Sequence, residues 1–269
     1  MTARMIADDD FAFALKRAES DWKSNMMHRT SPKGNGCSGC TQKIPDLDTP
    51  LSLRGLQRSG TNYCEFLLRE NYDIPADADI AKYKHRVEPP LDSEPPILLV
   101  VRHPIAWVVG FHRFAVDRRD TAEFHSWWSA ERSLNEMAAD YARLWNEKNG
   151  GWLPKAKGFV RHEDLIAAPE TALDAACPAF GVTRKQGPFV TSGYYFHIKP
   201  TLSEQARTPF LAAEATAEHR AQFLSDAGLA AFADTLDNEL LDMFRYRESL
   251  ERLVGQRDSA LINAQGGMA

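Results

Sequence analysis

The amino-acid sequence predicts an α/β fold of three layers, with a mostly parallel sheet and a helical C-terminal part. Segments typical of strands alternate with segments typical of helices from residue 51 to about residue 180. The run Ile97 to Val101 is entirely apolar and rich in β-formers, which is typical of a central parallel strand buried on both faces. From Ala213 to Arg252 the apolar residues recur at helical spacing.

Composition and charge narrow the class of protein. The chain has 269 residues, of which 43% are hydrophobic, so it can bury a sizeable core. Its net charge is −5, and a nucleic-acid partner is not expected because binding a phosphate polymer needs basic excess. The first residues carry the acidic run Asp8 to Asp10 where a signal peptide needs a basic flank. We therefore expect a cytoplasmic protein without a membrane span.

The chain divides into three expected regions. Residues 1–48 look like an N-terminal appendage that is partly loop, residues 49–252 form the α/β domain, and residues 253–269 form a flexible tail. Within the appendage, Phe11 to Trp22 has the spacing of an amphipathic helix. Cys37 and Cys40 form a CxxC pair in a Gly-rich stretch. This pair is either two incidental thiols in a loop or a metal or redox site, since no second CxxC completes a zinc set.

The first strand–turn–helix unit begins the domain. Leu51 to Leu56 alternates as a strand does, Gln57 to Thr61 is a Gly-bearing turn, and Asn62 to Asn71 has helical spacing. In that helix Tyr63, together with Phe66 and Leu67, is placed for one buried face.

The second unit and its continuation follow the same alternation. Arg102 and His103 end the apolar strand, and Pro104 is placed at the first turn of a helix. The further elements expected are a helix over 105–116, a helical region over 121–149 that Gly150 and Gly151 break, a strand over 158–161, a helix over 169–180, and an irregular segment over 181–210.

The turn between the first strand and its helix can bind phosphate. Backbone N–H groups in a Gly-bearing turn that leads into a helix N-terminus form a cradle for anions. Gly60 permits close approach of the backbone, Ser59 and Thr61 add hydroxyl groups, and Arg58 adds a positive charge. The alternative is an ordinary strand-to-helix turn.

The same loop differs from a nucleoside-triphosphate loop. Gly55 and Gly60 have the spacing of GxxxxGK[ST], but Thr61 stands at the lysine position and Asn62 at the magnesium-ligand position. These two differences disfavour the binding of ATP with magnesium. The phosphate chemistry that remains is one that needs no metal.

Arg102 is the second candidate for an anion-binding residue. It follows a buried strand, and α/β folds bind ligands at the carboxyl ends of their strands. Its guanidinium suits a phosphate, because it offers bidentate donors. The alternative is a structural arginine neutralised by a carboxylate or a helix end.

Three motifs in order resemble the sulfotransferase family. They cover about residues 51–180, with the helical tail resembling it loosely, and the soluble microbial-type members are the most similar. The matching stretches are Arg58-Ser59-Gly60-Thr61-Asn62-Tyr63, Arg102-His103-Pro104 after the apolar strand, and Phe159-Val160-Arg161-His162-Glu163-Asp164-Leu165 with Pro169-Glu170 behind it.

The resemblance implies a P-loop NTPase-like fold and a donor, 3′-phosphoadenosine 5′-phosphosulfate, used without a metal. It implies that Ser59, Gly60, Thr61 and Asn62 hold the 5′-phosphosulfate, and that Tyr63 stacks on the adenine. By the same resemblance, Arg58 stabilises charge on the leaving oxygen as the bond to sulfur breaks, and Arg102 binds the 3′-phosphate.

One position departs from the family pattern. The family usually has a serine eight residues after that arginine, and here the residue is Gly110. A hydroxyl donor to the 3′-phosphate is therefore missing, and His112 or Arg113 is a candidate to replace it. On the resemblance alone, Gly110→Ser is expected to tighten donor binding.

A general base completes the expected site. The family carries its base between the two phosphate motifs, where this chain has Lys84-His85-Arg86, so His85 is the candidate base. His103 is the second candidate, and a solvated basic loop is the alternative for His85. The expected activity is transfer of a sulfuryl group to a hydroxyl of a small-molecule or carbohydrate acceptor. A P-loop nucleotide kinase and an inactive nucleotide-binding relative are the alternative functions.

Overall fold

The computed structural model describes residues 49–82, 84, 94–117, 132–192 and 216–266. The chain divides into two compact units, Met1–Lys43 with His112–Arg132 and Ile44–Phe111 with Ser133–Ala269. The described part of the first unit is residues 112–117 and Arg132. The sheet and the residues of the candidate site described below belong to the second unit.

The sheet of the described region has three parallel strands. These are β1 (Ser52–Arg54), β2 (Ile97–Val101) and β3 (Ala156–Arg161), in the order β1-β2-β3. Leu53 lies opposite Leu98, and Val101 lies opposite Arg161. All five residues of β2 are buried, as its continuous apolar sequence predicts. The expected α/β class with a parallel sheet is confirmed.

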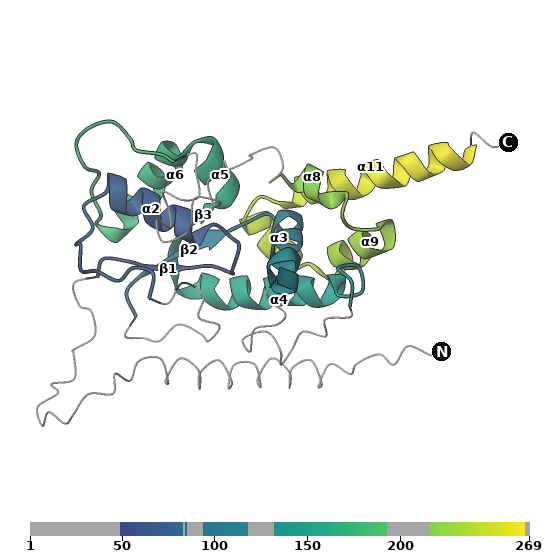
Figure 1. Ribbon diagram of the computed structural model, residues 1–269, viewed down its shortest axis with the longest axis horizontal. Helices are drawn as coiled ribbons and strands as arrows, with labels where there is room; N and C mark the ends of the chain where they lie inside the picture. Colours follow the sequence, from purple (N-terminus) through teal and green to yellow (C-terminus); the bar gives the residue numbers. More distant parts are fainter. Residues whose placement is uncertain (1–48, 83, 85–93, 118–131, 193–215, 267–269) are drawn as a thin grey trace, which may run out of the picture. The chain divides into compact units, whose positions relative to one another are not determined.

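Helices join and follow the strands (Figure 1). Between the strands lie α2 (Thr61–Asn71), α3 (Pro104–Asp117) and α4 (Ala138–Trp152), and a 3-10 turn, η1 (Leu153–Lys155), leads into β3. After β3 come α5 (His162–Ala167), α6 (Pro169–Ala176), η2 (Cys177–Phe180), α8 (Ala217–Ala221), α9 (Asp226–Thr235), α10 (Asn238–Met243) and α11 (Arg247–Gly266).

The two faces of the sheet are covered by different helices. Leu98 and Val100 on β2 belong to a buried cluster that also contains Leu67 of α2 and Leu173 of α6. Alternate strand residues point to opposite faces, and Phe159 on β3 meets Phe244, which follows α10, with ring centroids 5.1 Å apart. Figure 1 accordingly shows α2, α5 and α6 on one side of the strands and α4 on the other.

Several expected boundaries were wrong. Gly150 and Gly151 do not break the preceding helix, because α4 continues to Trp152. Each glycine costs a helix roughly 1 kcal/mol, but this end of α4 is held by the packing of Trp152, which is 2% exposed. The described part of the C-terminal region, from residue 216 on, contains four helices, and α11 continues past the expected domain end at residue 252 to Gly266.

Other expectations lie outside the described residues. The helix expected over Phe11 to Trp22 and the Cys37/Cys40 pair are among them, as are residues 118–131 of the expected helical region. Within the part of the chain that is described, no helix combines the length and the apolar character needed to cross a membrane.

Candidate functional site

The loop between β1 and α2 has an unusual backbone. Arg58 has φ 72° and Gly60 has φ 97°, so two of its residues lie in the left-handed region. At the start of the loop, a Cβ on Gly55 would lie 2.6 Å from the carbonyl oxygen of Val100 on β2, which only a glycine avoids. The loop therefore lies directly against the carboxyl end of the central strand.

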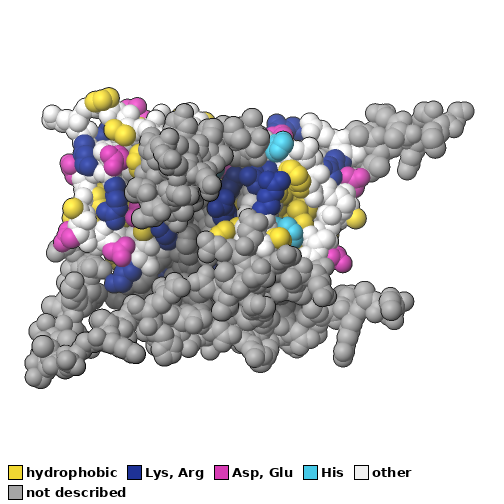
Figure 2. Space-filling model, in the orientation of Figure 1, with side chains coloured by type: hydrophobic (Ala, Val, Ile, Leu, Met, Phe, Trp, Pro, Cys, Tyr) yellow, Lys and Arg dark blue, Asp and Glu magenta, His cyan; other side chains and the backbone are white. Residues whose placement is uncertain are grey.

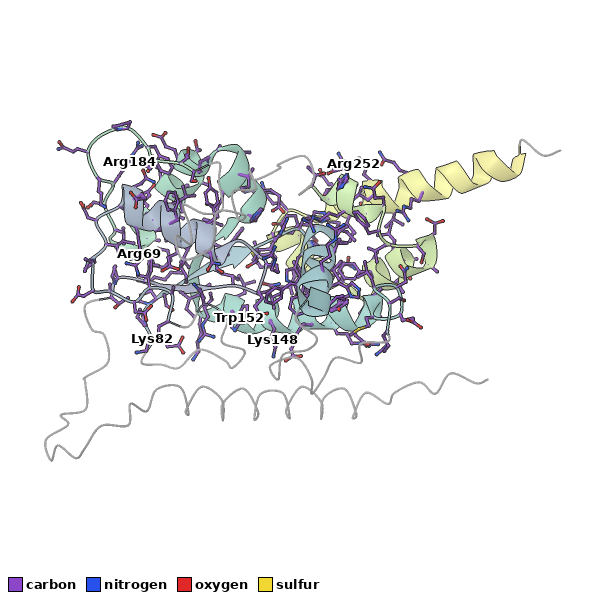
Figure 3. All side chains as sticks on the ribbon, viewed as in Figure 1. Arg69, Lys82, Lys148, Trp152, Arg184 and Arg252 are labelled. Atoms are coloured by element: carbon purple, nitrogen blue, oxygen red, sulfur yellow. The ribbon has the colours of Figure 1, made fainter. Side chains whose placement is uncertain are left out.

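A buried ion pair holds the strand that leads into this loop. Arg54, the last residue of β1, is fully buried and pairs with Glu94, whose side chain is 2% exposed. The guanidinium also lies 6.0 Å from the ring centre of Trp152 on α4. Trp152 is labelled in Figure 3. Removing one member of such a pair leaves an uncompensated buried charge, so Arg54 and Glu94 together fix where the loop begins.

Two tryptophans hold the two phosphate-motif candidates by their backbones. The indole Nε1–H of Trp107 on α3 donates to the carbonyl oxygen of Gln57 at 2.9 Å. The indole of Trp145 on α4 donates to the carbonyl oxygen of Arg102 at 3.3 Å. Both rings are almost wholly buried, so two large, rigid side chains hold the backbone of the loop and of the residue that follows β2.

Arg58 and Arg102 come together, as their positions after neighbouring parallel strands predict. Arg102 follows β2 and is 7% exposed, and its Nη1 donates to the carbonyl oxygen of Arg58 at 2.9 Å. Burial lowers the pKa of Arg102 to about 10, and the charges of Arg220 and Arg58 add to this effect. Glu163 opposes it.

Arg220 is a residue of this cluster that the sequence analysis missed. It lies on α8, and its Nη1 is 3.2 Å from the point where a Cβ on Gly110 would stand. Nη1 of Arg102 is 3.7 Å from the same point. The space beside Gly110 is thus filled by a guanidinium, so the expectation that a serine at Gly110 would supply a missing hydroxyl does not fit the structure. No motif surrounds Arg220 that could have identified it.

His162 is the fourth member of the cluster. It begins α5 directly after β3, and its Cδ2 lies 2.3 Å from the point where a Cβ on Gly60 would stand. Burial lowers its pKa well below the usual value, and Arg102, Arg220 and Arg58 lower it further. His162 is therefore neutral at physiological pH and offers the site a polar group without a charge. Figure 2 shows Lys and Arg side chains gathering near the middle of the face in view, with histidine close by.

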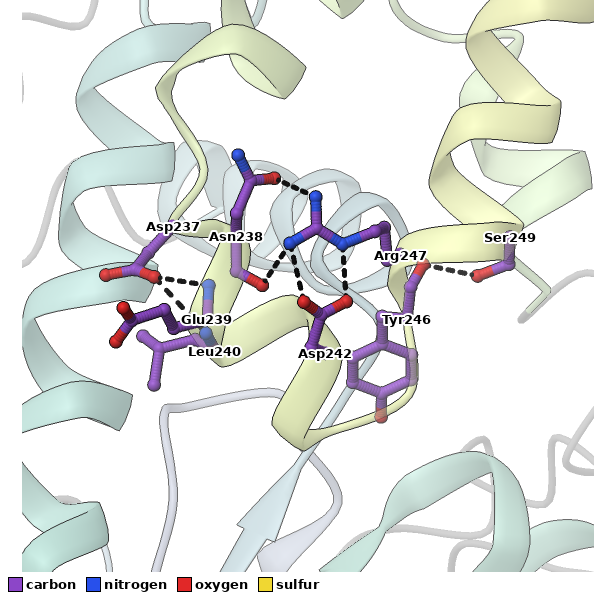
Figure 4. Close-up of polar contacts among 8 residues, drawn as sticks. All are labelled: Asp237, Asn238, Glu239, Leu240, Asp242, Tyr246, Arg247 and Ser249. Carbon is purple, nitrogen blue, oxygen red and sulfur yellow. Dashed lines mark hydrogen bonds and ion pairs between the residues drawn. The ribbon is translucent and has the colours of Figure 1, made fainter.

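His103 has a structural role. Its Nδ1 accepts the N–H of Ile105 at 3.2 Å, so the ring proton is on Nε2, which donates to Ser249 Oγ at 2.9 Å. The Ser249 hydroxyl in turn donates to the carbonyl oxygen of Tyr246 (Figure 4). Burial lowers the pKa of His103 to about 3, and the charges of Arg102 and Arg252 contribute. With both ring nitrogens engaged, His103 cannot accept a proton from a substrate without breaking this network.

The segment Arg161 to Leu165 connects the residues around Arg102 to the start of α11 through hydrogen bonds of Glu163. Arg161 makes a two-point ion pair with Asp164, with N–O distances of 2.7 and 2.6 Å. Glu163 accepts the backbone N–H of His103 at 3.0 Å and the hydroxyl of Tyr246 at 2.7 Å. One carboxylate thereby links the residue after Arg102 to the start of the last helix.

Two of the predicted donor ligands have other partners. The Ser59 hydroxyl is 2% exposed and donates to the carbonyl oxygen of Leu56 at 2.7 Å, so it would have to turn to donate to a phosphate. Tyr63 is 6% exposed and packs in the core cluster beside Phe66. Its stacking on adenine stays a prediction that requires its ring to be uncovered. Thr61 is buried, and Asn62 is half-buried on the first turn of α2.

His85 lies outside the described residues, but its neighbour in sequence is described. The carbonyl oxygen of Lys84 accepts the N–H of Gly55 at 3.0 Å, and its Nζ pairs with Glu65 of α2 at 3.2 Å. Lys84, the residue before the candidate base, therefore lies directly beside the start of the loop between β1 and α2. Among the described side chains, no group of three His, Cys, Asp or Glu residues could hold a metal ion.

Comparisons with known protein families, with curated proteins and with solved structures found no match for this chain.

Proposed function

We propose that the protein is a sulfotransferase with a P-loop-like fold. It would transfer a sulfuryl group from 3′-phosphoadenosine 5′-phosphosulfate to a hydroxyl of a small-molecule or carbohydrate acceptor. The observation that carries this proposal is the convergence of Arg58, Arg102 and Arg220 on one strand-to-helix loop at the carboxyl ends of β1 and β2.

The charge of this site suits a donor with several phosphate groups. Three guanidinium groups in a partly buried place attract polyanions strongly, because the low local dielectric strengthens each charge interaction. The loop adds backbone N–H groups at the start of α2, where the helix dipole also favours an anion. Since guanidinium groups supply the positive charge, donor binding does not depend on the lysine and the hydroxyl of a magnesium-nucleotide loop, whose positions hold Thr61 and Asn62.

In the proposed reaction the acceptor oxygen attacks sulfur in line with the leaving group. A new oxygen–sulfur bond forms as the bond from sulfur to the bridging oxygen breaks. The bridging oxygen keeps the electron pair and leaves as part of 3′,5′-bisphosphoadenosine, and Arg58 would stabilise its charge. The acceptor proton passes to His85. His85 is preferred over His103 because His103 uses both ring nitrogens within the protein.

Nucleotide binding is tested by thermal unfolding. 3′,5′-Bisphosphoadenosine without magnesium is expected to raise the unfolding temperature, and a concentration one hundred times the Kd stabilises the fold by about 2.7 kcal/mol. ATP with magnesium is expected to give a much smaller shift. A shift with ATP and magnesium alone would instead favour a kinase, and no shift with either nucleotide would overturn the proposal.

Transfer itself is tested with labelled donor and a panel of sugars and simple alcohols, with products identified by mass. The variant His85→Ala is expected to lose about 10²–10⁴-fold in rate while binding the bisphosphate normally. His103→Ala is not an informative control, because its loss disturbs the fold, so the control is Lys84→Met, which removes a neighbouring charge. A His85→Ala enzyme that keeps more than about a tenth of the rate would show that another group takes the proton.

A further inference from the structure

We propose that Trp107 is a positioning residue for the loop between β1 and α2. Through the hydrogen bond from its indole N–H to the carbonyl oxygen of Gln57, it selects one of two turn types and keeps this oxygen away from a bound anion. The selection of the turn does not depend on the proposed function. Its effect on an anion rests on that function, which supplies the phosphosulfate group that the loop would hold.

Residues Leu56 to Ser59 form a type II β-turn. The N–H of Ser59 donates to the carbonyl oxygen of Leu56 at 3.0 Å, and the third residue of the turn, Arg58, has φ 72°. The second residue, Gln57, does not have a positive φ, so the turn matches type II and neither of the mirror-image types. Type II favours glycine at the third position, and an arginine there is strained.

A type I turn is the alternative for the same four residues. The two types differ in the orientation of the central peptide, which joins Gln57 to Arg58, and type I gives the third residue an ordinary negative φ. Turning this peptide over would relieve the strain at Arg58, and it would point the Gln57 carbonyl oxygen away from Trp107. The hydrogen bond from the indole exists only in the strained turn, so it favours that turn.

The indole cannot follow the carbonyl oxygen if the peptide turns over. Trp107 lies on α3 and is fully buried. Phe111 stacks on its ring with centroids 5.1 Å apart, and Tyr141 of α4 meets it edge-on at 6.3 Å. The donor is therefore fixed on the buried side of the loop, whereas the side chain of Arg58 is exposed.

The two neighbouring peptides are held independently of Trp107. The carbonyl oxygen of Leu56 accepts both the N–H and the hydroxyl of Ser59, and the carbonyl oxygen of Arg58 accepts Nη1 of Arg102 at 2.9 Å. The hydrogen bond that closes the turn is common to types I and II. The central peptide is therefore the one whose orientation depends on the indole.

The orientation of the central peptide decides what the loop presents to an anion. In the observed turn its carbonyl oxygen points inward, and the N–H groups of Gly60, Thr61 and Asn62 have no hydrogen-bond partner among the described residues. In the other orientation the Gln57 oxygen would point to the exposed side of the loop. Its partial negative charge would then oppose an anion at these N–H groups.

The residue type at position 58 explains why the turn needs this support. A glycine would adopt the same backbone without strain, but it lacks the guanidinium that the proposed reaction uses. Arg58 keeps the guanidinium, and the hydrogen bond of Trp107 offsets the strain. Strained residues persist at functional sites only where the surrounding structure holds them in this way.

The first experiment measures the turn type in the full-length chain and uses no ligand. Arg58→Gly and Arg58→Ala both remove the guanidinium, but only alanine is strained by a left-handed backbone. Arg58→Gly is therefore expected to unfold at the higher urea concentration. When Trp107→Phe is added, the turn can become type I, and the order is expected to reverse, because glycine then only adds freedom to the unfolded chain.

The second experiment measures by calorimetry whether the loop loses affinity for one phosphate group in particular. The ligands are 3′,5′-bisphosphoadenosine and adenosine 3′-monophosphate, which lacks the 5′-phosphate. Trp107→Phe is expected to weaken the bisphosphate about 5–30-fold, the cost of restoring the left-handed backbone without its hydrogen bond. The monophosphate should change little. The control Phe111→Leu disturbs the same ring cluster but keeps the indole donor, and it should affect neither ligand strongly.

The outcomes separate the inference from the proposed function. A glycine that stays the more stable residue at position 58 after Trp107→Phe, or equal losses for the two nucleotides, would overturn the inference. The reversed order together with a native chain that binds neither nucleotide would leave the selection of the turn standing and remove the proposed function. If Trp107→Phe folds poorly, the benzothiophene analogue of tryptophan at residue 107, in which sulfur replaces the N–H, carries both comparisons.

Discussion

Gly60 meets two requirements at once, since its backbone is left-handed and the His162 ring lies against it. An alanine there is strained by roughly 1–2 kcal/mol from the backbone alone, and its Cβ would lie 2.3 Å from His162 Cδ2. We expect Gly60→Ala to lower the free energy of unfolding by more than this backbone strain alone. We also expect it to weaken the binding of phosphate. Denaturant unfolding and calorimetry measure the two effects.

Gly151 provides the matched control for that substitution. It lies exposed near the end of α4, and nothing approaches the position of its Cβ within 4 Å. Gly151→Ala is expected to stabilise the fold by about 0.5–1 kcal/mol, because alanine loses less conformational freedom in a helix. A loss of stability at Gly60 no larger than the change at Gly151 would contradict the crowding between Gly60 and His162.

His103 makes stability depend on pH in a defined window. Its pKa is about 3 in the folded protein and about 6.5 when unfolded, so the unfolded chain binds one more proton between these values. The contribution of His103 is fully present above about pH 6.5 and is lost as the pH falls toward 3. For His103→Asn, which can still accept the Ile105 N–H, we expect a shallower pH dependence, by up to about 1.4 kcal/mol per pH unit.

Urea unfolding at several pH values between 4 and 7.5 measures this difference. At the upper end the variant is less stable than the native protein, because the bond to Ser249 is altered. The stability of the two proteins therefore converges as the pH falls. Parallel pH profiles would show that His103 does not stay neutral in the fold.

At the scale of elements, α11 positions α8. Arg257 donates to the carbonyl oxygens of Ala221 at 2.6 Å and Leu224 at 2.7 Å, and so caps the end of the short helix that carries Arg220. A helix of five residues has little stability of its own. We expect Arg257→Ala to weaken phosphate binding about 10-fold, the effect of losing one to two hydrogen bonds to a charged group, although Arg257 is not itself a ligand.

The control for this prediction is Arg252→Ala, which also lies on α11 (Figure 3). Arg252 pairs with Glu218 at 2.8 Å, but both side chains are more than half exposed. Such surface pairs contribute about 0–1 kcal/mol, so phosphate binding should change little. Because Glu218 also lies on α8, equal losses in the two variants would contradict a particular role for the two backbone hydrogen bonds of Arg257.

A second contact between elements joins α5 to the residue before α11, through the hydrogen bond between Tyr246 and Glu163. Tyr246→Phe removes the hydroxyl that donates to Glu163 and leaves one carboxylate oxygen without that donor. We expect a loss of about 1–3 kcal/mol in the free energy of unfolding. In the control Tyr72→Phe, the partner Asp174 is 40% exposed, so water can replace the lost bond and the loss should be smaller.

At the scale of the whole molecule, the sequence predicted the features that depend on local patterns. It did not predict most of the contacts between residues that are far apart in the chain. The three strands, the helix after Pro104 and the meeting of Arg58 with Arg102 followed from apolar runs and from the geometry of parallel sheets. The burial of Tyr63 was also present in the sequence, because helical spacing puts it on the same face as Leu67. The prediction that the Tyr63 ring stacks on adenine came from the family resemblance instead, and it requires the ring to be accessible.

The rest depends on packing between residues far apart in sequence. Arg220 follows Gly110 by 110 positions, and no periodicity or motif relates them. Likewise, the glycines at the end of α4 predicted a break, but the helix continues because tertiary packing, such as the burial of Trp152, outweighs local propensity. Contacts between distant elements that no motif or strand order relates, such as that of Arg220 with the residues around Gly110, cannot be predicted from local preferences.

The same separation determines when the site can form during folding. A nascent chain that ends at residue 192 already contains β1, β2, β3 and the loop at Gly60, yet it lacks Arg220. Contacts that close long stretches of chain carry a larger entropy cost and tend to form late. If α8 docks after the main barrier, phosphate will not speed refolding of the purified protein, and it will slow unfolding in proportion to its occupancy. The kinetics of phosphate capture would then report the last step in the assembly of this fold.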